Sequence, residues 1–141
     1  SFTPHEISLQ LEKGVPGVAA RIKAMHKLAK LGWNVGIRID PIIDCEDFEV
    51  RYSNLIDDLF CGLPEERLHS VSMGAFRMPS NFFRKIEKLY PHEPLFAGRL
   101  KRTQSSVSYN PEIENLRLQT CRELILKKIT KEKLFECSLS P

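Results

Sequence analysis

The features that would assign an activity directly are missing from this sequence of 141 residues. Its four cysteines, Cys45, Cys61, Cys121 and Cys137, lie at least 16 residues apart, so they form no CxxC pair and no zinc or iron–sulfur motif. The four histidines are equally scattered. No phosphate-binding glycine loop, nucleophile elbow or HExxH motif occurs. We therefore predict reduced, structural cysteines, structural histidines and no metal site in this chain.

Long apolar runs are also missing. No stretch approaches the roughly 20 apolar residues that span a bilayer, and the first residues lack the charged and apolar regions of a signal peptide. We therefore expect a soluble, cytoplasmic protein with no membrane partner. Ser1 is not Met, and patterned sequence follows it at once, so we expect the natural chain to begin earlier.

The composition is that of an ordinary globular protein, with 42% hydrophobic and 28% charged residues. The net charge of +3 is unevenly distributed. Residues 1–98 contain 12 Lys and Arg against 13 Asp and Glu, whereas residues 99–141 contain 9 against 5. A basic segment can follow a phosphate backbone, but a solvated helix face gives the same count, so charge alone leaves both interpretations open.

Apolar periodicity predicts an alternation of helices and strands. Helical spacing is found in residues 16–32, 44–62 and 80–89, and a period of two in residues 34–43 and 68–76. This alternation is typical of parallel sheets with right-handed crossovers. We predict an α/β fold that forms part of a (β/α) barrel, with the functional groups at the C-terminal ends of the strands.

The first predicted strand carries two charges on one face. Because side chains alternate along a strand, Arg38 and Asp40 lie opposite the apolar Ile37 and Ile39, and toward the barrel interior. The pair could bind a carboxylate together with a hydroxyl or amine of a ligand, or it could form an internal ion pair. Both interpretations remain open.

The segment 76–90 interleaves cations with aromatic residues, which is the chemistry that grips phosphates and stacks bases. Helical spacing favours a different interpretation of its second half. It predicts that Phe82, Phe83, Ile86 and Leu89 face the core, while the helix leaves three cations in solvent, namely Arg84, Lys85 and Lys88.

The pattern changes after residue 98. Residues 100–104 and 107–109 are predicted to form a hairpin, with a loop as the alternative. A long amphipathic helix is predicted over residues 113–129, and a short closing strand over 133–137. We therefore divide the chain into a barrel portion, residues 1–98, and a basic extension, residues 99–141, packed on the barrel.

Four segments, taken together, resemble the C-terminal part of the spore photoproduct lyase family. They are residues 20–22, the run GWNVGIRIDP at 32–41, residues 76–79, and the run IEKLYP at 86–91. The resemblance covers essentially the whole chain. It implies the C-terminal βα units of a TIM-like radical S-adenosylmethionine (SAM) barrel with a [4Fe–4S] cluster. The implied function is repair of thymine-dimer-type DNA lesions through a 5'-deoxyadenosyl radical.

The resemblance also limits what this chain can contain. The cluster motif CxxxCxxC, the hydrogen-donating cysteine and the radical-relaying tyrosines of the family all lie upstream of Ser1. It therefore implies a missing N-terminal part of the same protein and no catalytic residue in this segment, so that the chain alone would be inactive. The resemblance places Ser1 beside SAM, and Arg38 and Asp40 on a strand that borders the adenosine. Spore photoproduct lyase has apolar residues at the last two positions.

Further positions correspond to DNA contacts of the family. Arg77 matches an arginine just after the next strand, and residues 99–109 match a hairpin that holds the lesion out of the duplex. This hairpin is shorter and keeps four of the implied contacts, Arg99, Lys101, Arg102 and Tyr109. Lesion-containing DNA is therefore the expected partner.

Two other interpretations remain. The chain could be a non-catalytic module that binds nucleic acid or another partner, based on the basic extension and on the cations of residues 84–88. Alternatively, it could fold only together with its missing half, in which case an exposed strand edge predicts self-association.

Overall fold

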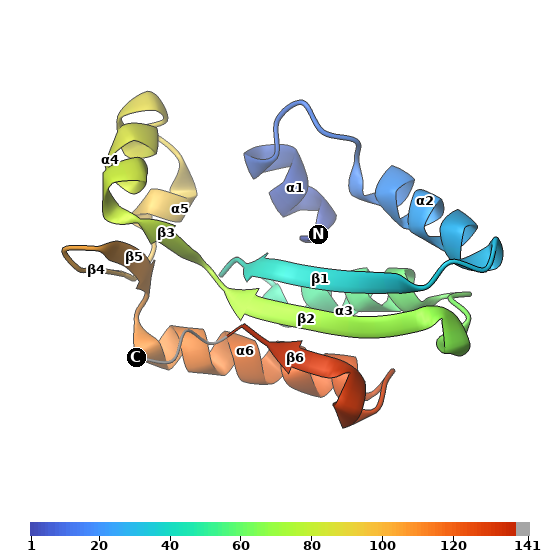
Figure 1. Ribbon diagram of the computed structural model, residues 1–141. Helices are drawn as coiled ribbons and strands as arrows, with labels where there is room; N and C mark the ends of the chain where they lie inside the picture. Colours follow the sequence, from blue (N-terminus) through green and yellow to red (C-terminus); the bar gives the residue numbers. More distant parts are fainter. Residues whose placement is uncertain (138–141) are drawn as a thin grey trace.

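The computed structural model describes residues 1–137 and contains two small sheets (Figure 1). The first is a parallel sheet of three strands in the order β1-β2-β6. In its register Ile37 pairs with Val71 and Ile39 with Met73. Its strands are β1 (Val35–Ile42), β2 (Leu68–Ala75) and β6 (Leu134–Glu136).

Among residues 1–137, helices cover only one face of this sheet. The apolar side chains of the strands join one core with those of α3 (Phe48–Phe60) and α6 (Pro111–Leu126), and α3 lies behind the sheet in Figure 1. α1 (His5–Leu11) and α2 (Val18–Lys30) lie on the β1 side of the sheet. The opposite face carries the small and charged residues of β1 and β2 and remains open.

The second sheet is antiparallel, in the order β3-β5-β4. It is packed against α4 (Ser80–Leu89) and α5 (Pro94–Ala97), where Phe83 and Phe96 meet edge to face with ring centroids 5.1 Å apart. Its strands are β3 (Arg77–Pro79), β4 (Leu100–Arg102) and β5 (Ser106–Tyr109). Two 3-10 turns, η1 (Glu65–Arg67) and η2 (Lys131–Lys133), complete the described elements.

Most predicted elements are confirmed. The α/β class and the parallel pairing of β1 with β2 agree with the sequence patterns, and the hairpin is present. The partial barrel and the division at residue 98 stay predictions, although segments beyond residue 98 supply strands to both sheets. The elements β3, α1 and α5 were not predicted from the sequence. Within residues 1–137, no helix is both long and apolar enough to cross a bilayer.

One packing prediction is wrong. Phe82 and Leu89 do not face the core, because their exposed fractions are 53% and 70%. The reason is that α4 rests on a sheet of three short strands and not on a broad layer. Only a narrow side of the helix, centred on the fully buried Phe83, has protein to pack against.

Candidate functional site

The open face of the parallel sheet carries an ion pair. Arg38 donates from Nη2 and Nε to Oδ2 of Asp40, at 2.6 and 3.1 Å. The hydrogen bond from Arg38 to Asp40 raises the pKa of Arg38 further. The Arg38 side chain is 60% exposed and that of Asp40 20%, so the pair borders solvent and is not buried inside the fold. The prediction that Arg38 and Asp40 share one face of the strand is confirmed. The two side chains form an ion pair that is still accessible to a ligand.

Small residues surround this pair and leave space above the sheet. In the register of the two strands, Gly36 lies beside Ser70, and Arg38 beside Ser72. Gly74 lies close to its neighbours, because a Cβ there would lie 3.3 Å from Oδ1 of Asp40 and 3.2 Å from Cβ of Cys137. On β1 and β2, this face therefore carries small residues beside the ion pair of Arg38 and Asp40.

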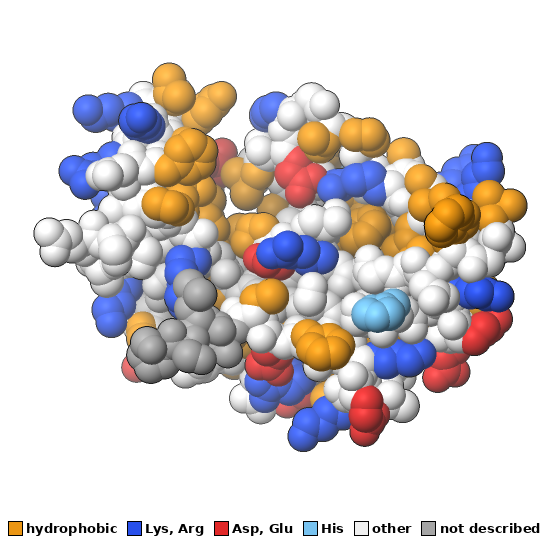
Figure 2. All heavy atoms as spheres, in the orientation of Figure 1, with side chains coloured by type: hydrophobic (Ala, Val, Ile, Leu, Met, Phe, Trp, Pro, Cys, Tyr) orange, Lys and Arg blue, Asp and Glu red, His pale blue; other side chains and the backbone are white. Residues whose placement is uncertain are grey.

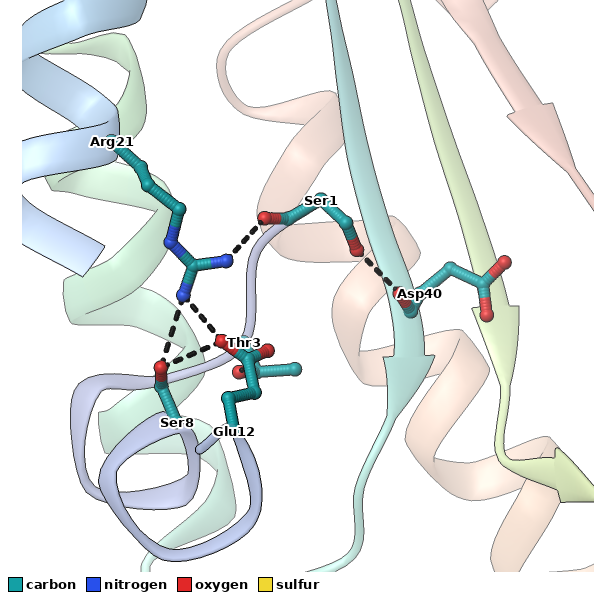
Figure 3. A network of polar contacts seen from close by, with 6 residues as sticks. All are labelled: Ser1, Thr3, Ser8, Glu12, Arg21 and Asp40. Atoms are coloured by element: carbon teal, nitrogen blue, oxygen red, sulfur yellow. Dashed lines mark hydrogen bonds and ion pairs between the residues drawn. The ribbon is translucent and has the colours of Figure 1, made fainter. Parts of the chain in front are cut away.

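Ser1 lies beside the same carboxylate-bearing residue (Figure 3). Its hydroxyl donates to the backbone oxygen of Asp40 at 2.6 Å, and the N–H of Phe2 donates to the backbone oxygen of Arg38 at 2.8 Å. The Asp40 carboxylate points away from Ser1, toward β2. The three residues predicted to lie beside SAM are thus neighbours in space.

Arg21 holds Ser1 in place. The sequence indicated no function for this residue, which entered only as part of the segment 20–22 that carries the family resemblance. Its guanidinium donates to the backbone oxygen of Ser1 and to the side chains of Ser8 and Glu12 (Figure 3). Burial opposes the ionisation of Glu12, but hydrogen bonds from Ser8 and Thr3 and the charge of Arg21 outweigh it and lower its pKa. The sequence gave no indication that Glu12 and Arg21, nine residues apart, would pair, because α1 was not predicted.

A pocket of about 260 Å³ lies at the C-terminal ends of the strands. It joins the two sheets, because Asp40 comes from the first and Arg77 from the second. Arg77 Nη2 lies 3.5 Å from Oε1 of Glu114, which also lines the pocket. Cys137 completes this wall with an exposed side chain. Glu136 also lines the pocket, which therefore has one cation and three carboxylates in its lining.

The antiparallel sheet divides the predicted nucleic-acid contacts between two faces. Arg77, Ser108 and Lys101 are in register across its three strands, so their side chains share one face. Arg99 precedes this row and lines a shallow pocket with Lys101. Two cations therefore flank a serine on the face that continues from the strand-end pocket.

Arg102 and Tyr109 lie on the other face and support the fold. Arg102 donates to both carboxylate oxygens of Glu87, at 2.7 and 3.3 Å, and its guanidinium lies 5.0 Å from the centre of the Phe83 ring. Tyr109 is 2% exposed, and its hydroxyl accepts a hydrogen bond of 2.8 Å from the N–H of Asp44. Burial raises the pKa of Tyr109. Tyr109 is therefore enclosed by the protein, whereas the Arg102 side chain is still 50% exposed, so its role as a DNA contact stays a prediction.

The described residues do not fit an iron–sulfur cluster. Within residues 1–137, no three His, Cys, Asp or Glu side chains are grouped so that they could hold a metal ion. Cys121 is buried, and burial raises the pKa of its thiol to about 12, which disfavours the thiolate that a metal requires. The other three cysteines lie in separate places, Cys45 half-buried, Cys61 exposed behind the sheet and Cys137 at the strand-end pocket.

No family model matches the chain. The chain is similar to the spore photoproduct lyase of Bacillus subtilis (strain 168), with 33% identity over 95 residues, which cover 64% of this chain and 27% of the relative. The resemblance to this enzyme is therefore confirmed by comparison.

Solved structures of spore photoproduct lyase share the fold. A variant with bound AdoMet and dinucleoside spore photoproduct matches 99% of this chain with a TM-score of 0.77 and 20% identity. The enzyme complexed with dinucleoside spore photoproduct matches with a TM-score of 0.76. This chain spans 43% of the length of each solved chain and matches a C-terminal portion.

Proposed function

We propose that this chain is the C-terminal part of a cytoplasmic, SAM-dependent lyase that repairs thymine-dimer-type lesions in DNA, as its resemblance to spore photoproduct lyase implies. One observation carries the proposal. The polar sheet face with Asp40 and the cation row of Arg77 and Lys101 meet at one pocket at the strand ends. Strand ends are where barrels of parallel strands place their functional groups.

The open sheet face is the proposed place for SAM. Asp40 Oδ2 receives Arg38, while Oδ1 remains to accept a hydrogen bond from a hydroxyl or ammonium group of the cofactor. Arg38 orients this carboxylate, and the Ser1 hydroxyl donates to the backbone oxygen of the same residue. A ligand lying on the strands would meet no side chain at Gly36, where a Cβ would contact only Ser70, at 3.6 Å.

The radical chemistry requires more than these residues. SAM bound to a [4Fe–4S] cluster supplies a deoxyadenosyl radical, and the described residues offer no ligand set for that cluster. The proposal therefore requires cluster cysteines from another part of the intact protein. In the proposed enzyme, the residues of this segment bind and orient SAM and the DNA lesion.

The cation row is the proposed DNA contact. Arg77 and Lys101 are placed to hold phosphates next to the lesion, and Arg99 extends the same basic surface. Holding a lesion outside the duplex costs a few kcal/mol of stacking, which contacts of this kind offset.

The first test is the coding sequence upstream of Ser1, where we expect a CxxxCxxC motif. On the intact protein, after iron and sulfide analysis, calorimetry should detect SAM binding. Asp40→Asn should weaken it by roughly tenfold or more, because the lost charge removes a charge-assisted hydrogen bond. Asp58→Asn, an exposed change on α3 away from the sheet face, should have no effect. An upstream sequence without the motif would rule out the radical mechanism.

A second candidate function has some support. The same cation row would suit a nucleic-acid-binding module without catalysis, as would the exposed cations of α4. Such a module would bind DNA with equal affinity whether SAM is present or not. In the lyase we expect the lesion and SAM to share one pocket, so the affinity for a lesion-containing oligonucleotide should change when SAM is added.

A further inference from the structure

Helix α4 presents an unpartnered surface that the proposed function does not use. Phe82, Leu89 and Tyr90 are 53%, 70% and 57% exposed. Three cations are exposed on the same helix, namely Arg84, Lys85 and Lys88. We call these six residues the α4 surface. In Figure 2, basic and apolar side chains gather over α4 in the view that also displays the open face of the parallel sheet.

The helix arranges five of these residues as two parallel stripes, and Tyr90 follows directly after its last residue. Phe82, Lys85 and Leu89 follow one another at spacings of three and four residues and form one stripe, in which the lysine lies between two apolar side chains. Arg84 and Lys88, four residues apart, form the neighbouring stripe. A row of cations thus runs beside a row of apolar groups on the exposed side of α4.

The charge of the α4 surface is not neutralised within the described residues. Glu87 is the one acidic residue of α4, and Arg102 donates hydrogen bonds to both of its carboxylate oxygens. Arg84 is held by neutral partners, the side chain of Asn81 at 2.9 Å and the backbone oxygen of Ser80 at 3.4 Å. No ion pair within residues 1–137 includes either lysine of the surface.

α4 is fixed to the sheet that carries the cation row. It follows β3 directly, so Ser80 begins the helix three residues after Arg77. The N–H of Ser80 donates to Ser105 at 3.0 Å, and its hydroxyl donates to Thr103 at 2.9 Å, both in the loop between β4 and β5. α4 therefore has a fixed position relative to Arg77, but it packs on the face of the antiparallel sheet opposite Arg77 and Lys101. A ligand held at Arg77 would have to pass around the edge strand β3 to reach the α4 surface.

We propose that the α4 surface binds unpaired nucleotides that extend beyond the strand-end pocket; this rests on the proposed function, because it takes the nucleic acid to be held at the Arg77 and Lys101 row. The cations suit the phosphates, and the exposed rings of Phe82 and Tyr90 suit stacking on bases that have no pairing partner. A membrane is a poorer match, since a helix on a bilayer segregates charges from a broad apolar face, whereas Lys85 interrupts this apolar stripe.

The test compares oligothymidines of about 4 and about 16 nucleotides, the range that single-strand sites cover. Fluorescence anisotropy at several salt concentrations gives the affinity of each. Phe82→Ala/Tyr90→Ala should reduce the affinity for the longer oligonucleotide roughly tenfold, because stacking is lost, and should leave the affinity for the shorter one unchanged. Lys85→Ala/Lys88→Ala should reduce the salt slope for the longer one by about 1.4, since each phosphate contact on a single strand contributes about 0.7. Lys23→Ala/Lys27→Ala, two exposed lysines of α2, is the matched control and should change neither.

The outcomes separate this inference from the proposed function. Wild-type binding of both oligonucleotides by both α4 variants would overturn the role of α4 and leave the lyase proposal standing. If the α4 variants lost equal affinity for duplex and single-stranded 16-mers, the α4 surface would not be specific for unpaired nucleotides. If they lost affinity only for anionic vesicles, the partner would be a membrane. Binding of the short oligonucleotide that does not depend on Arg77 and Lys101 would remove the basis of both proposals.

Discussion

Glu12 is the residue whose ionisation matters most for the corner that carries Ser1. Its carboxylate accepts hydrogen bonds from Thr3, Ser8 and Arg21, so it ties the extended start of the chain to α1 and α2. These contacts lower its pKa in the folded state. The carboxylate therefore stabilises the fold above the pKa of the unfolded chain, and this stabilisation disappears as the pH falls through the lower folded-state pKa.

We predict that Glu12→Gln lowers the free energy of unfolding at pH 7 by about 1 to 2 kcal/mol, because it weakens charge-assisted hydrogen bonds in a half-buried place. The difference from the unmodified chain should vanish in acid, as measured by urea unfolding at a series of pH values. Glu6→Gln is the control, because Glu6 is 58% exposed and lies 4.0 Å from Arg51. A deficit that stayed constant down to strongly acidic pH would show that the charge of Glu12 is not its source.

The close approach of Asp40 to Gly74 gives a second prediction at this scale. Gly74→Ala places a Cβ within 3.3 Å of the Asp40 carboxylate and 3.2 Å of Cys137. Overpacking of this kind should lower the free energy of unfolding by about 1 kcal/mol or more. Gly36→Ala on the neighbouring strand meets Ser70 Oγ at an ordinary 3.6 Å and should be neutral or slightly stabilising. Equal stabilities for the two variants would contradict this packing around Gly74.

At the scale of elements, the proposed function gives the β4–β5 hairpin one face for binding and one for folding. Lys101 lies in the row with Ser108 and Arg77, while the neighbouring Arg102 turns to Glu87 and Phe83. Adjacent residues of one strand thus have separate tasks, because successive side chains point to opposite faces.

We predict opposite phenotypes for two adjacent alanine substitutions. Lys101→Ala should leave the melting temperature unchanged and reduce the salt slope of duplex DNA binding by about 0.9, the contribution of one phosphate contact. Arg102→Ala should lower the melting temperature by about 2 to 4 °C and leave the salt slope almost unchanged. Thermal unfolding and anisotropy titrations measure both quantities. A larger loss of salt slope in the Arg102 variant would mean that the assignment of faces is reversed.

The elements with strong periodicity were predictable from the sequence. Val35, Ile37 and Ile39 indicate a strand with a polar reverse face, and the structure confirms it. The residues that build the site depend on contacts between distant segments, such as Ser1 with Asp40 and Arg77 with Glu114. Local patterns contain no information about such pairs.

The hairpin shows where sequence reasoning reached its limit. Its existence was predicted, but β3 has only three residues and its partner β5 lies far along the chain. Alternation places Lys101 and Arg102 on opposite faces of the predicted strand, but without that register the sequence could not tell which face packs against α4, or that Tyr109 is buried. For α4 the apolar spacing correctly predicted a helix. The sequence did not show that so little of the helix surface would pack against the rest of the protein.

At the scale of the whole molecule, residues 1–137 cover the parallel sheet on one face only. Parallel sheets in α/β proteins normally have both faces covered, so the open face with Arg38 and Asp40 is expected to meet further structure or a ligand. Under the proposed function, SAM and the remaining part of the intact protein cover this face. Self-association of the chain through its exposed strand edge stays a prediction.

The central claim is that the intact protein performs SAM-dependent repair with this segment as one wall of its site. The most direct measurement is conversion of dinucleoside spore photoproduct by the intact, iron-reconstituted protein under anaerobic, reducing conditions. We predict that the lesion is consumed only when SAM is present, and much more slowly in the Asp40→Asn variant. A protein that binds SAM and an iron–sulfur cluster, yet leaves the dinucleoside photoproduct unchanged, would contradict the claim.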